Sequence, residues 1–457
     1  MSEAARSTAE WQRTDVANYL HPFTNHLALA ADKALILARG SGCHVWDTDG
    51  NRLLDGFAGL ACVALGYGRR ELGEAAARQI GDLSYSSSFF KYTNKPAIAL
   101  AEKLVRLTPE GLSHVFYANS GSEANDTAIR MVRHYWRLEG QPARRIVIGR
   151  EAAYHGSTVA AGALSGMAAM HEQGALLPDV AHIKAPYQFA YGRGVDEREF
   201  ARMAASWLEE KILELGPERV AAFFAEPIQG AGGFKMPPRG YFNEIQRICK
   251  KYGVLLVIDE VITGFGRTGR WFASELYEIK GIDLMCLAKG ITSGYVPLSA
   301  VMVGDRIASA LIDKGGVFAH GFTSSGHPVP CAVALENIRI LQDEHVIDRV
   351  AHDTGPYFHE QMEKLSSHDI VGEARSAGLM GALELVNDRD TLEPIDNADE
   401  VCERVRDLGL AHGIIVRPVH STVTIAPPLV ITRTEIDFLF ERLRATLDDF
   451  AGILRAK

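Results

Sequence analysis

An unbroken apolar run leads into two acidic residues in the stretch Gly253-Val254-Leu255-Leu256-Val257-Ile258-Asp259-Glu260. Branched aliphatic residues without polar alternation are typical of a strand that is buried on both faces, as in a parallel sheet. Asp259 and Glu260 would then lie at the carboxyl end of that strand. The stretch therefore predicts an α/β fold in which acidic side chains reach one edge of a parallel sheet.

A lysine closes a second apolar run, residues 284–288. Lys289 follows this run directly and is itself followed by Gly290. Burial at the end of a strand lowers the pKa of an ammonium group and favours the neutral amine, which is the form that makes a Schiff base with a carbonyl. A structural lysine that extends its ammonium group to solvent is the simpler interpretation when Lys289 is considered alone.

Strand-like runs alternate with amphipathic segments through the middle of the chain. The runs that predict strands are 114–118, 145–149, 221–225, 254–259, 283–288 and 299–303. The segments that predict helices are 122–138, 196–215 and 238–252. This alternation favours a largely parallel sheet that is flanked by helices.

The two ends of the chain differ from its middle. Residues 46–51, Trp-Asp-Thr-Asp-Gly-Asn, carry the signal of a β-hairpin turn, and the last part of the chain has a helix-then-strand pattern. We expect a large central domain at 70–325. Residues 1–69 and 326–457 are expected to combine into a smaller α+β domain.

The overall composition excludes several classes of protein. The 457 residues are 47% hydrophobic and carry a net charge of −9, with a pI near 6.0. An acidic chain is a poor candidate for binding nucleic acid. We find neither an apolar run long enough to span a bilayer nor an export signal, so we expect no membrane partner and a cytoplasmic location.

Cysteine and histidine spacing gives no metal site. The six cysteines show no Cys-x-x-Cys pattern, so neither a disulfide framework nor a zinc knuckle is expected. His21, His26, His155 and His327 show no paired spacing. We therefore predict reduced thiols, ordinary histidines and no metal.

Two segments could bind parts of a flat, phosphorylated ligand. Asn119–Asn125 follows a strand and opens a helix, so its amides and the hydroxyls of Ser120 and Ser122 would surround the positive helix end. An ordinary serine N-cap is the alternative. Tyr154 follows the predicted strand 145–149, where its ring could stack on a ligand or pack on the core.

Two other enzyme classes have motifs similar to the segment around Asp259 and Glu260, but the rest of the sequence fits neither class. Residues 264–269, Gly-Phe-Gly-Arg-Thr-Gly, satisfy the dinucleotide pattern, but Asp259 and Glu260 precede the glycines and no acid ends a following strand at the expected distance. Residues 255–260 are also similar to the magnesium-binding strand of nucleotide hydrolases. Those enzymes need a phosphate loop, and the chain contains no Gly-Lys dipeptide.

An ordered set of motifs resembles the class III aminotransferases that depend on pyridoxal 5′-phosphate. The motifs span nearly the whole chain and are found at 119–125, 154–156, 226–233, 259–269, 288–290, 320–328, 372–375, Arg417 and 427–428. The resemblance implies the fold type I of pyridoxal-phosphate enzymes. In that fold a large domain holds a mostly parallel seven-stranded sheet, and a small α+β domain is made from both chain ends.

The same resemblance assigns the two catalytic roles. Lys289 would bind the cofactor covalently as a Schiff base and then move a proton between the substrate carbon and the cofactor. Asp259 would pair with the protonated pyridine nitrogen and keep the ring able to accept electrons.

Further residues would hold the cofactor by resemblance. Ser120, Gly121 and Ser122 would bind the phosphate, together with Thr323 from the neighbouring subunit. Tyr154 would stack on one ring face and Val261 would close the other. His155 and Glu226 would complete the hydrogen-bond network around the ring.

The substrate side is also assigned by resemblance. Arg417 would bind the carboxylate of the acceptor through two parallel hydrogen bonds. Leu60, Ala61 and Tyr154 would contact the substrate. A tryptophan is usual where Ala61 stands, and Ser325 replaces a common tyrosine, so we expect a donor pocket that is enlarged near Ala61.

Ile262 after Asp-Glu-Val indicates the branch of the family that acts on amines or ω-amino acids with pyruvate. We expect a ping-pong ω-transaminase. The donor, such as putrescine, β-alanine, taurine or an arylalkylamine, would become an aldehyde or ketone. Pyruvate, or another 2-oxo acid, would receive the amino group and become an amino acid. The alternative is another enzyme of this fold, namely a 2,2-dialkylglycine decarboxylase, racemase or aminomutase. A homodimer or tetramer with shared active sites is expected.

Overall fold

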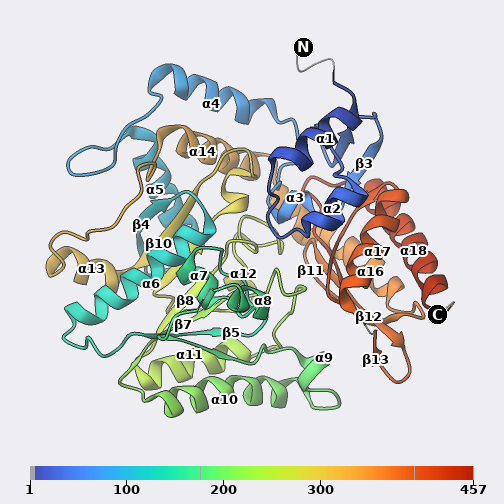
Figure 1. Cartoon of the computed structure of the whole chain (residues 1–457). Coiled ribbons are helices and arrows are strands. Elements are labelled where there is room, and N and C mark those ends of the chain that lie inside the picture. The colour runs from blue at the N-terminus through green and yellow to red at the C-terminus, as the bar shows by residue number, and fades with distance from the viewer. Residues whose placement is uncertain (1–5, 175, 396, 456–457) are drawn as a thin grey trace.

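The computed structural model describes residues 6–174, 176–395 and 397–455. Its centre is a seven-stranded sheet with the strand order β4-β10-β9-β8-β7-β5-β6. The bounds of these strands are β4 Leu112–Ala118, β5 Ile146–Arg150, β6 Val180–Ile183, β7 Val220–Ala225, β8 Leu255–Asp259, β9 Leu284–Leu287 and β10 Ser299–Gly304. Figure 1 shows this sheet surrounded by helices.

The strand directions place several strand ends at one edge of the sheet. β10 runs antiparallel to both of its neighbours, β4 and β9. The remaining neighbours, from β9 through β8, β7 and β5 to β6, pair in parallel. The carboxyl ends of β4, β5, β7, β8 and β9 therefore meet at the same edge, where ligands bind in open α/β sheets.

Helices cover both faces of this sheet, and alternate strand residues face opposite layers. In β8, Leu256 and Ile258 pack in one apolar cluster with α5, α10, α11 and α14, whereas Leu255 and Val257 pack in a second cluster with α6 and α13. Burial on both faces explains why the strand is apolar without alternation. The helices of this part are α4 Arg70–Asp82, α5 Lys95–Leu107, α6 Gly121–Leu138, α7 Val159–Leu164, α10 Glu197–Leu215, α11 Tyr241–Tyr252, α13 Asp305–Asp313 and α14 Pro328–Asp343.

Two smaller sheets bring the ends of the chain together. One has the order β1-β2-β3-β14 and the other has the order β11-β12-β16-β15, with β13 paired to β12. Their bounds are β1 Leu37–Ser41, β2 His44–Asp47, β3 Arg52–Asp55, β11 Val371–Ala377, β12 Met380–Asp388, β13 Glu393–Pro394, β14 Ile414–Ile415, β15 Arg417–Val419 and β16 Thr422–Ile425. β14 pairs in parallel with β3, so both chain ends share one sheet.

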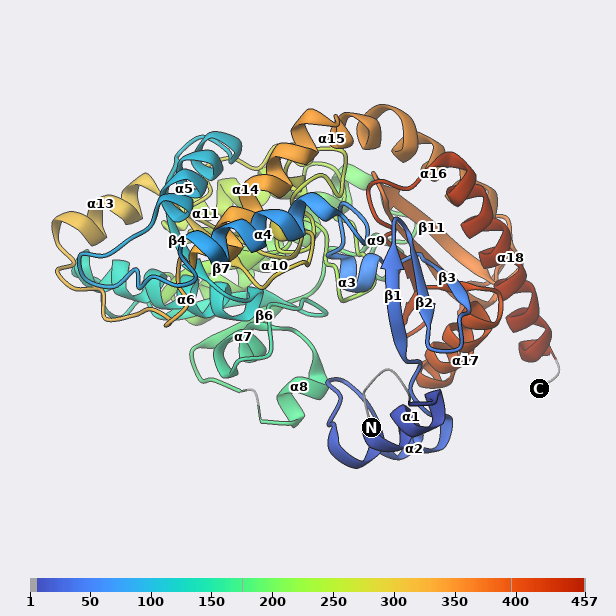
Figure 2. The same ribbon diagram turned by 90° about the horizontal axis from the view of Figure 1, so that it is seen from above.

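The N-terminal and C-terminal segments lie side by side in Figures 1 and 2. Helices of the C-terminal part pack against the small sheets: α16 Gly355–Leu365, α17 Ala398–Ala411 and α18 Arg433–Arg455. The short helix α15 Val346–Arg349 packs against α14. The boundaries at residues 69 and 325 stay a prediction. α14, which begins just beyond residue 325, packs against α4 and α5.

Short elements connect the layers. They are α1 Thr8–Asn18, α2 His26–Asp32, α3 Ala58–Ala61, α8 Ala168–Glu172, α9 Gln188–Tyr191, α12 Ala273–Leu276, the 3₁₀-helix η2 Lys289–Thr292 and the π-helical turn η3 Val350–Thr354. Among the described residues, no helix is both long and apolar enough to cross a membrane.

The mostly parallel sheet and the hairpin between β2 and β3 are as predicted from the sequence. The helix predicted at 238–252 begins later, at Tyr241, because Pro238 lies in a turn and Gly240 adopts a left-handed φ of 88°. β6 was not predicted. It is a short edge strand with a weak pattern, and its single neighbour in the sheet is β5.

Candidate active site

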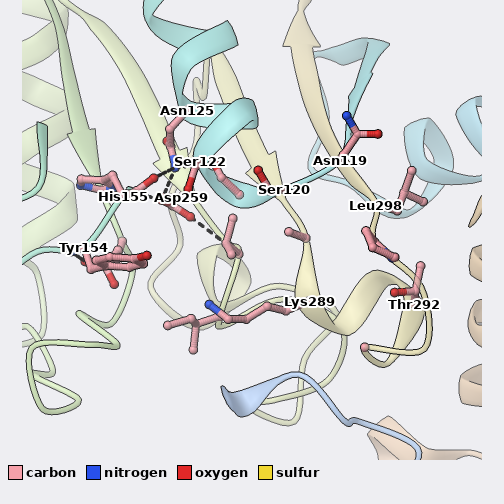
Figure 3. A pocket seen from close by; sticks show the side chains of 18 of the residues that line it. Asn119, Ser120, Ser122, Asn125, Tyr154, His155, Asp259, Lys289, Thr292 and Leu298 are labelled. Carbon is pink, nitrogen blue, oxygen red and sulfur yellow. Dashed lines mark hydrogen bonds and ion pairs between the residues drawn. The ribbon is translucent and has the colours of Figure 1, made fainter. Parts of the chain in front are cut away.

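A cavity of about 300 Å³ opens at the carboxyl edge of the central sheet. Loops that follow β4, β5, β7, β8 and β9 supply most of its lining. The lining residues are Asn119, Ser120, Gly121, Ser122, Asn125, Tyr154, His155, Gly156, Glu226, Ile228, Asp259, Val261, Ile262, Ala288, Lys289, Thr292, Gly294, Val296, Pro297 and Leu298. In Figure 3, Lys289 extends between Tyr154 and His155 on one side and Thr292 and Leu298 on the other.

Lys289 enters the cavity from the end of β9. Its backbone adopts a left-handed φ of 48°, which is unfavourable for a residue with a Cβ and commonly marks a functional position. Burial lowers the pKa of Lys289, and the charge of Arg417 acts in the same direction. Asp259, Cys62 and Glu226 oppose this shift. The structure thus places in the cavity a lysine whose ammonium group loses its proton more readily than usual.

Asp259 ends β8 and is only 4% exposed. Its Oδ1 accepts the backbone N–H of Val261 at 3.0 Å. Its Oδ2 lies 2.8 Å from Nδ1 of His155 and accepts the amide of Asn125 at 2.8 Å. These partners fix the carboxylate and supply donors that suit a negative charge.

Asn125 is a site residue that sequence reasoning missed. It lies in the second turn of α6, and its amide donates to the carbonyl oxygen of His155 at 2.8 Å as well as to Asp259. Asn125 therefore ties the carboxylate to the loop that carries Tyr154 and His155. The motif around it predicts a phosphate site at a helix start, and an amide without charge or nucleophilicity gives no signal of a contact with Asp259.

The start of α6 forms the opposite end of the cavity. Ser120 is its N-cap, and its hydroxyl accepts the N–H of Glu123 at 3.2 Å, as the N-cap alternative predicts. The hydroxyl of Ser122 accepts the N–H of Ser157 at 3.0 Å. Both hydroxyls keep a hydrogen for donation, and the first amides of the helix have no intrahelical partner. This positive helix end suits an anion.

Two glycines keep this end open and compact. A Cβ on Gly121 would lie 3.1 Å from Cγ1 of Val261, so a side chain there would crowd the space beside the helix start. Gly156 has a φ of 138°, and a Cβ there would lie 2.5 Å from Oγ of Ser122. The close approach of these two loops therefore requires glycine at residue 156.

Glu226 braces the wall beside Tyr154. Its Oε1 accepts the backbone N–H of Tyr154 at 3.2 Å, and its Oε2 accepts the N–H of Gly230 at 2.7 Å. Burial raises the pKa of Glu226. The Tyr154 hydroxyl lies 3.0 Å from the hydroxyl of Ser157. Glu226 thus positions the backbone that presents the Tyr154 ring.

Four of the predicted site residues lie outside the cavity lining. Thr323 is exposed, and its carbonyl oxygen accepts the hydroxyl of Tyr85 at 3.0 Å. Arg417 holds its guanidinium over the ring of Phe57, 5.4 Å from the ring centre. Leu60 is 62% exposed, whereas Ala61 is 3% exposed and packs in the same apolar cluster as Phe57.

Sequence reasoning also missed one wall of the cavity. Thr292, Gly294, Val296, Pro297 and Leu298 come from the connection between β9 and β10. These side chains are apolar or weakly polar, so no chemical signal distinguishes them from ordinary loop residues. Their position depends on the antiparallel direction of β10, which the sequence pattern does not reveal.

The site as a whole matches a ligand with three different groups. A lysine with a lowered pKa suits a carbonyl carbon, a buried carboxylate suits a basic ring nitrogen, and the helix start suits a phosphate. Asn125 Oδ1 and His155 Nε2 are buried without a hydrogen-bond partner, among the described residues, beside that carboxylate. The lining therefore fits pyridoxal 5′-phosphate, the cofactor that the sequence motifs imply.

Comparisons with known proteins agree with this geometry. Residues 28–447 match the aminotransferase class-III family. A putrescine–pyruvate aminotransferase of Pseudomonas aeruginosa is 48% identical over 450 residues, which cover 98% of this chain and 98% of that protein. A diaminobutyrate–2-oxoglutarate transaminase of Halomonas elongata is 42% identical, with coverage of 92% and 91%.

Solved structures that resemble this chain are also transaminases. An (S)-enantioselective ω-transaminase of Thermomicrobium roseum superimposes with a TM-score of 0.94 at 43% identity, covering 97% of this chain and 99% of that one. The ω-transaminase of Pseudomonas jessenii in complex with PMP superimposes with a TM-score of 0.94 at 38% identity, covering 97% of this chain and 98% of that one.

Proposed function

The chain belongs to the class III aminotransferases, which use pyridoxal 5′-phosphate, and on this premise we propose that it moves an amino group from an amine or ω-amino acid to pyruvate. The observation that carries the proposal is that one cavity is lined by both a partly buried Lys289 and a buried Asp259. The similarity of the chain to a putrescine–pyruvate aminotransferase supports an amine as the donor and pyruvate as the acceptor. A panel of amines with pyruvate, scored by alanine formation, tests the reaction. Alanine in equal amount to the aldehyde or ketone is expected without carbon dioxide, whereas alanine formed together with carbon dioxide from a 2,2-dialkylglycine donor would indicate the decarboxylase.

The cofactor would be held from three sides. Ser120, Gly121 and Ser122 would bind its phosphate at the start of α6, Tyr154 would stack on the ring, and Val261 would close the opposite face. When bound, pyridoxal 5′-phosphate supplies a ring that accepts the electrons left after a proton leaves the substrate carbon.

The chain itself would supply the proton transfer and the charge that supports it. In its neutral form the Nζ of Lys289 would take a proton from the substrate carbon and pass it on to the cofactor, and its lowered pKa makes that form accessible. Asp259, held by His155 and Asn125, would keep the ring nitrogen protonated. Glu226 would hold the Tyr154 backbone in place.

Arg417 would serve the acceptor and withdraw from the donor. Its resting position over Phe57, outside the cavity lining, supports a side chain that moves in when a carboxylate is present. Burial lowers the pKa of Arg417, so a carboxylate partner would relieve an unfavourable charge.

Arg417→Ala is therefore expected to reduce kcat/KM for pyruvate roughly 100-fold, because a charge-assisted, two-bond contact is lost. The half-reaction with a carboxylate-free amine is expected to change less than about fivefold. Both half-reactions are measured separately by stopped-flow absorbance. Arg417→Lys keeps the charge without the planar fork and should fall between the two. Equal losses in both half-reactions would contradict the role.

Ala61 would enlarge the donor pocket. It packs with Ile228, which lines the cavity, so a larger side chain at residue 61 presses toward the cavity wall. Ala61→Trp is expected to lower kcat/KM for bulky arylalkylamines about tenfold or more relative to small amines. A donor panel measures this ratio, and Ala61→Leu should give an intermediate value. An unchanged preference between small and bulky amines would remove the pocket assignment.

The subunit arrangement and the cellular location also stay predictions. We infer a homodimer in which Thr323 reaches the neighbouring subunit's phosphate site, and its exposure in a single chain supports this role. Phe90, 96% exposed in one chain, supports a surface that another subunit covers. Cys43, Cys62, Cys249, Cys286 and Cys331 form no disulfide within the described part of the chain, which supports a location in the reducing cytoplasm.

A further inference from the structure

The turn that begins with Lys289 has an unusual backbone. The 3₁₀-helix Lys289–Thr292 is followed by Ser293 with a φ of 50° and Gly294 with a φ of 73°. Lys289 and Ser293 both adopt a left-handed conformation that their Cβ atoms disfavour. Within the turn the carbonyl oxygen of Gly290 accepts the N–H of Ser293 at 3.2 Å, and the hydrogen-bond geometry of a 3₁₀-helix is poorer than that of an α-helix. Something outside this turn must hold it in place.

Asn337, on α14, fixes this turn through hydrogen bonds from its side chain. Its side chain is fully buried, with 0% exposure. The amide donates to the carbonyl oxygens of Gly290 at 2.9 Å and Ile291 at 3.0 Å. Its Oδ1 accepts the hydroxyl of Ser293 at 2.6 Å. One side chain thus uses both of its amide hydrogens and its carbonyl oxygen in hydrogen bonds to the turn that begins with Lys289.

The same chain of hydrogen bonds continues to a segment from the N-terminal part of the chain. Oγ of Ser293 accepts the backbone N–H of Leu65 at 3.2 Å. Leu65 belongs to the segment that carries Ala61 and Cys62, and a Cβ on Gly294 would lie 3.1 Å from Sγ of Cys62. Asn337 therefore connects the lysine turn to the segment that the proposed function places beside the donor.

We propose that Asn337 is a positioning residue for Lys289, which fixes the lysine turn against α14 and against the segment around Leu65. The inference rests on the assignment of Lys289 as the cofactor-binding lysine. An amide suits the task because it donates twice and accepts once, whereas an aliphatic side chain would remove one hydrogen bond from each of two buried carbonyl groups and leave the hydrogen of the Ser293 hydroxyl without its acceptor.

The turn geometry also controls the environment of the amine. Lys289 is surrounded by the carboxylates of Asp259 and Glu226, the thiol of Cys62 and the guanidinium of Arg417, and burial is the dominant influence on its pKa. A relaxed turn would admit solvent and let the pKa rise toward its ordinary value. At a given pH, less of the amine would then be neutral, and capture of an aldehyde would slow.

The test measures capture of pyridoxal 5′-phosphate by the full-length apoenzyme, followed by the visible absorbance of the product over a range of pH. Asn337→Leu is expected to slow capture roughly 10- to 100-fold and to move the rate profile to higher pH. Asn337→Asp should behave similarly, because a carboxylate accepts the Ser293 hydroxyl but lacks the amide hydrogens. Capture rates and a pH profile equal to those of the wild type would overturn the proposal, even if thermal stability fell.

Matched variants separate positioning from general loss of stability. Ile338→Val loosens α14 at the next residue, which is fully buried in the core, and should lower the melting temperature without moving the pH profile. If Asn337→Leu does not fold, Ser293→Ala removes the bonds to Asn337 and Leu65 and should shift the profile in the same direction. A wild-type profile for Ser293→Ala would then overturn the proposal.

A lysine variant distinguishes this inference from the assignment on which it rests. Lys289→Ala should abolish covalent capture. If Lys289→Ala captures the cofactor normally, the proposed function fails. If it does not capture the cofactor but Asn337→Leu behaves like the wild type, only the role of Asn337 fails.

Discussion

Replacing Lys289 by methionine is expected to lower turnover of amine and pyruvate by roughly 10⁴-fold or more, because the variant loses both the covalent attachment of the cofactor and the group that moves the proton. Methionine is similar in length and apolar, so the buried site should tolerate it. Stopped-flow measurement of each half-reaction, together with alanine formation under steady turnover, checks the result. Both half-reactions should fail, because the same amine serves both.

A second partly buried lysine, Lys235, provides the matched control. Burial lowers the pKa of Lys235 to about 8, so Lys235 resembles Lys289 in its electrostatic environment. Its Nζ donates to the carbonyl oxygen of Gly232, and the residue lies outside the cavity lining. Lys235→Met should keep turnover within about tenfold of the wild type. If the two methionine variants lost activity equally, the loss would reflect burial of a cation and not the chemistry of Lys289.

Asp259→Asn is expected to reduce kcat roughly 10²- to 10⁴-fold, the range expected when a buried ion pair loses one charge. Asparagine keeps the shape of the side chain, so His155 and Asn125 remain near their positions. The proton transfer should slow because the ring nitrogen loses its anionic partner. The decay of the donor half-reaction, measured with a deuterated and a normal amine, reports whether that step has become limiting.

The neighbouring acid separates charge from local structure. Glu260 is fully buried, and burial raises its pKa to about 7. Its carboxylate accepts the backbone N–H groups of Ala273 and Ser274, away from the cavity lining. Glu260→Gln should lower stability by about 1–3 kcal/mol but leave kcat within about tenfold. A loss of kcat in Glu260→Gln as large as in Asp259→Asn would place the effect in the fold of this loop.

Much of the candidate site could be predicted because it depends on strand ends. β8 and β9 are short apolar runs, so Asp259 and Lys289 stand out as the charged residues that end them. Parallel pairing then brings the two ends to one edge. The start of α6 was also visible, although the structure shows that Ser120 caps the helix by its side chain.

The residues that support those charges could not be predicted in the same way. Asn125 and Asn337 are neutral amides whose partners lie far along the chain. No local sequence pattern indicates that a buried amide will form hydrogen bonds with a distant carboxylate or turn. The wall at 292–298 and the resting place of Arg417 depend on how β10 and β15 pair across the fold. Such tertiary arrangements are set by packing and not by periodicity.

The pairing of β3 with β14 has a consequence for how the chain is made. Leu54 pairs with Ile414 and Asp55 with Ile415, partners about 360 residues apart, a separation that slows folding. On a ribosome that adds about 5–20 residues per second, the edge of β3 must wait tens of seconds for its partner. The strands of the central sheet end at Gly304 and the helices that cover its faces end at Asp343, so this part of the fold can assemble in that interval. Synthesis is therefore expected to pass through a stage in which the cofactor-binding edge exists while one small sheet still has an open strand, a target for chaperones and for mispairing between nascent chains.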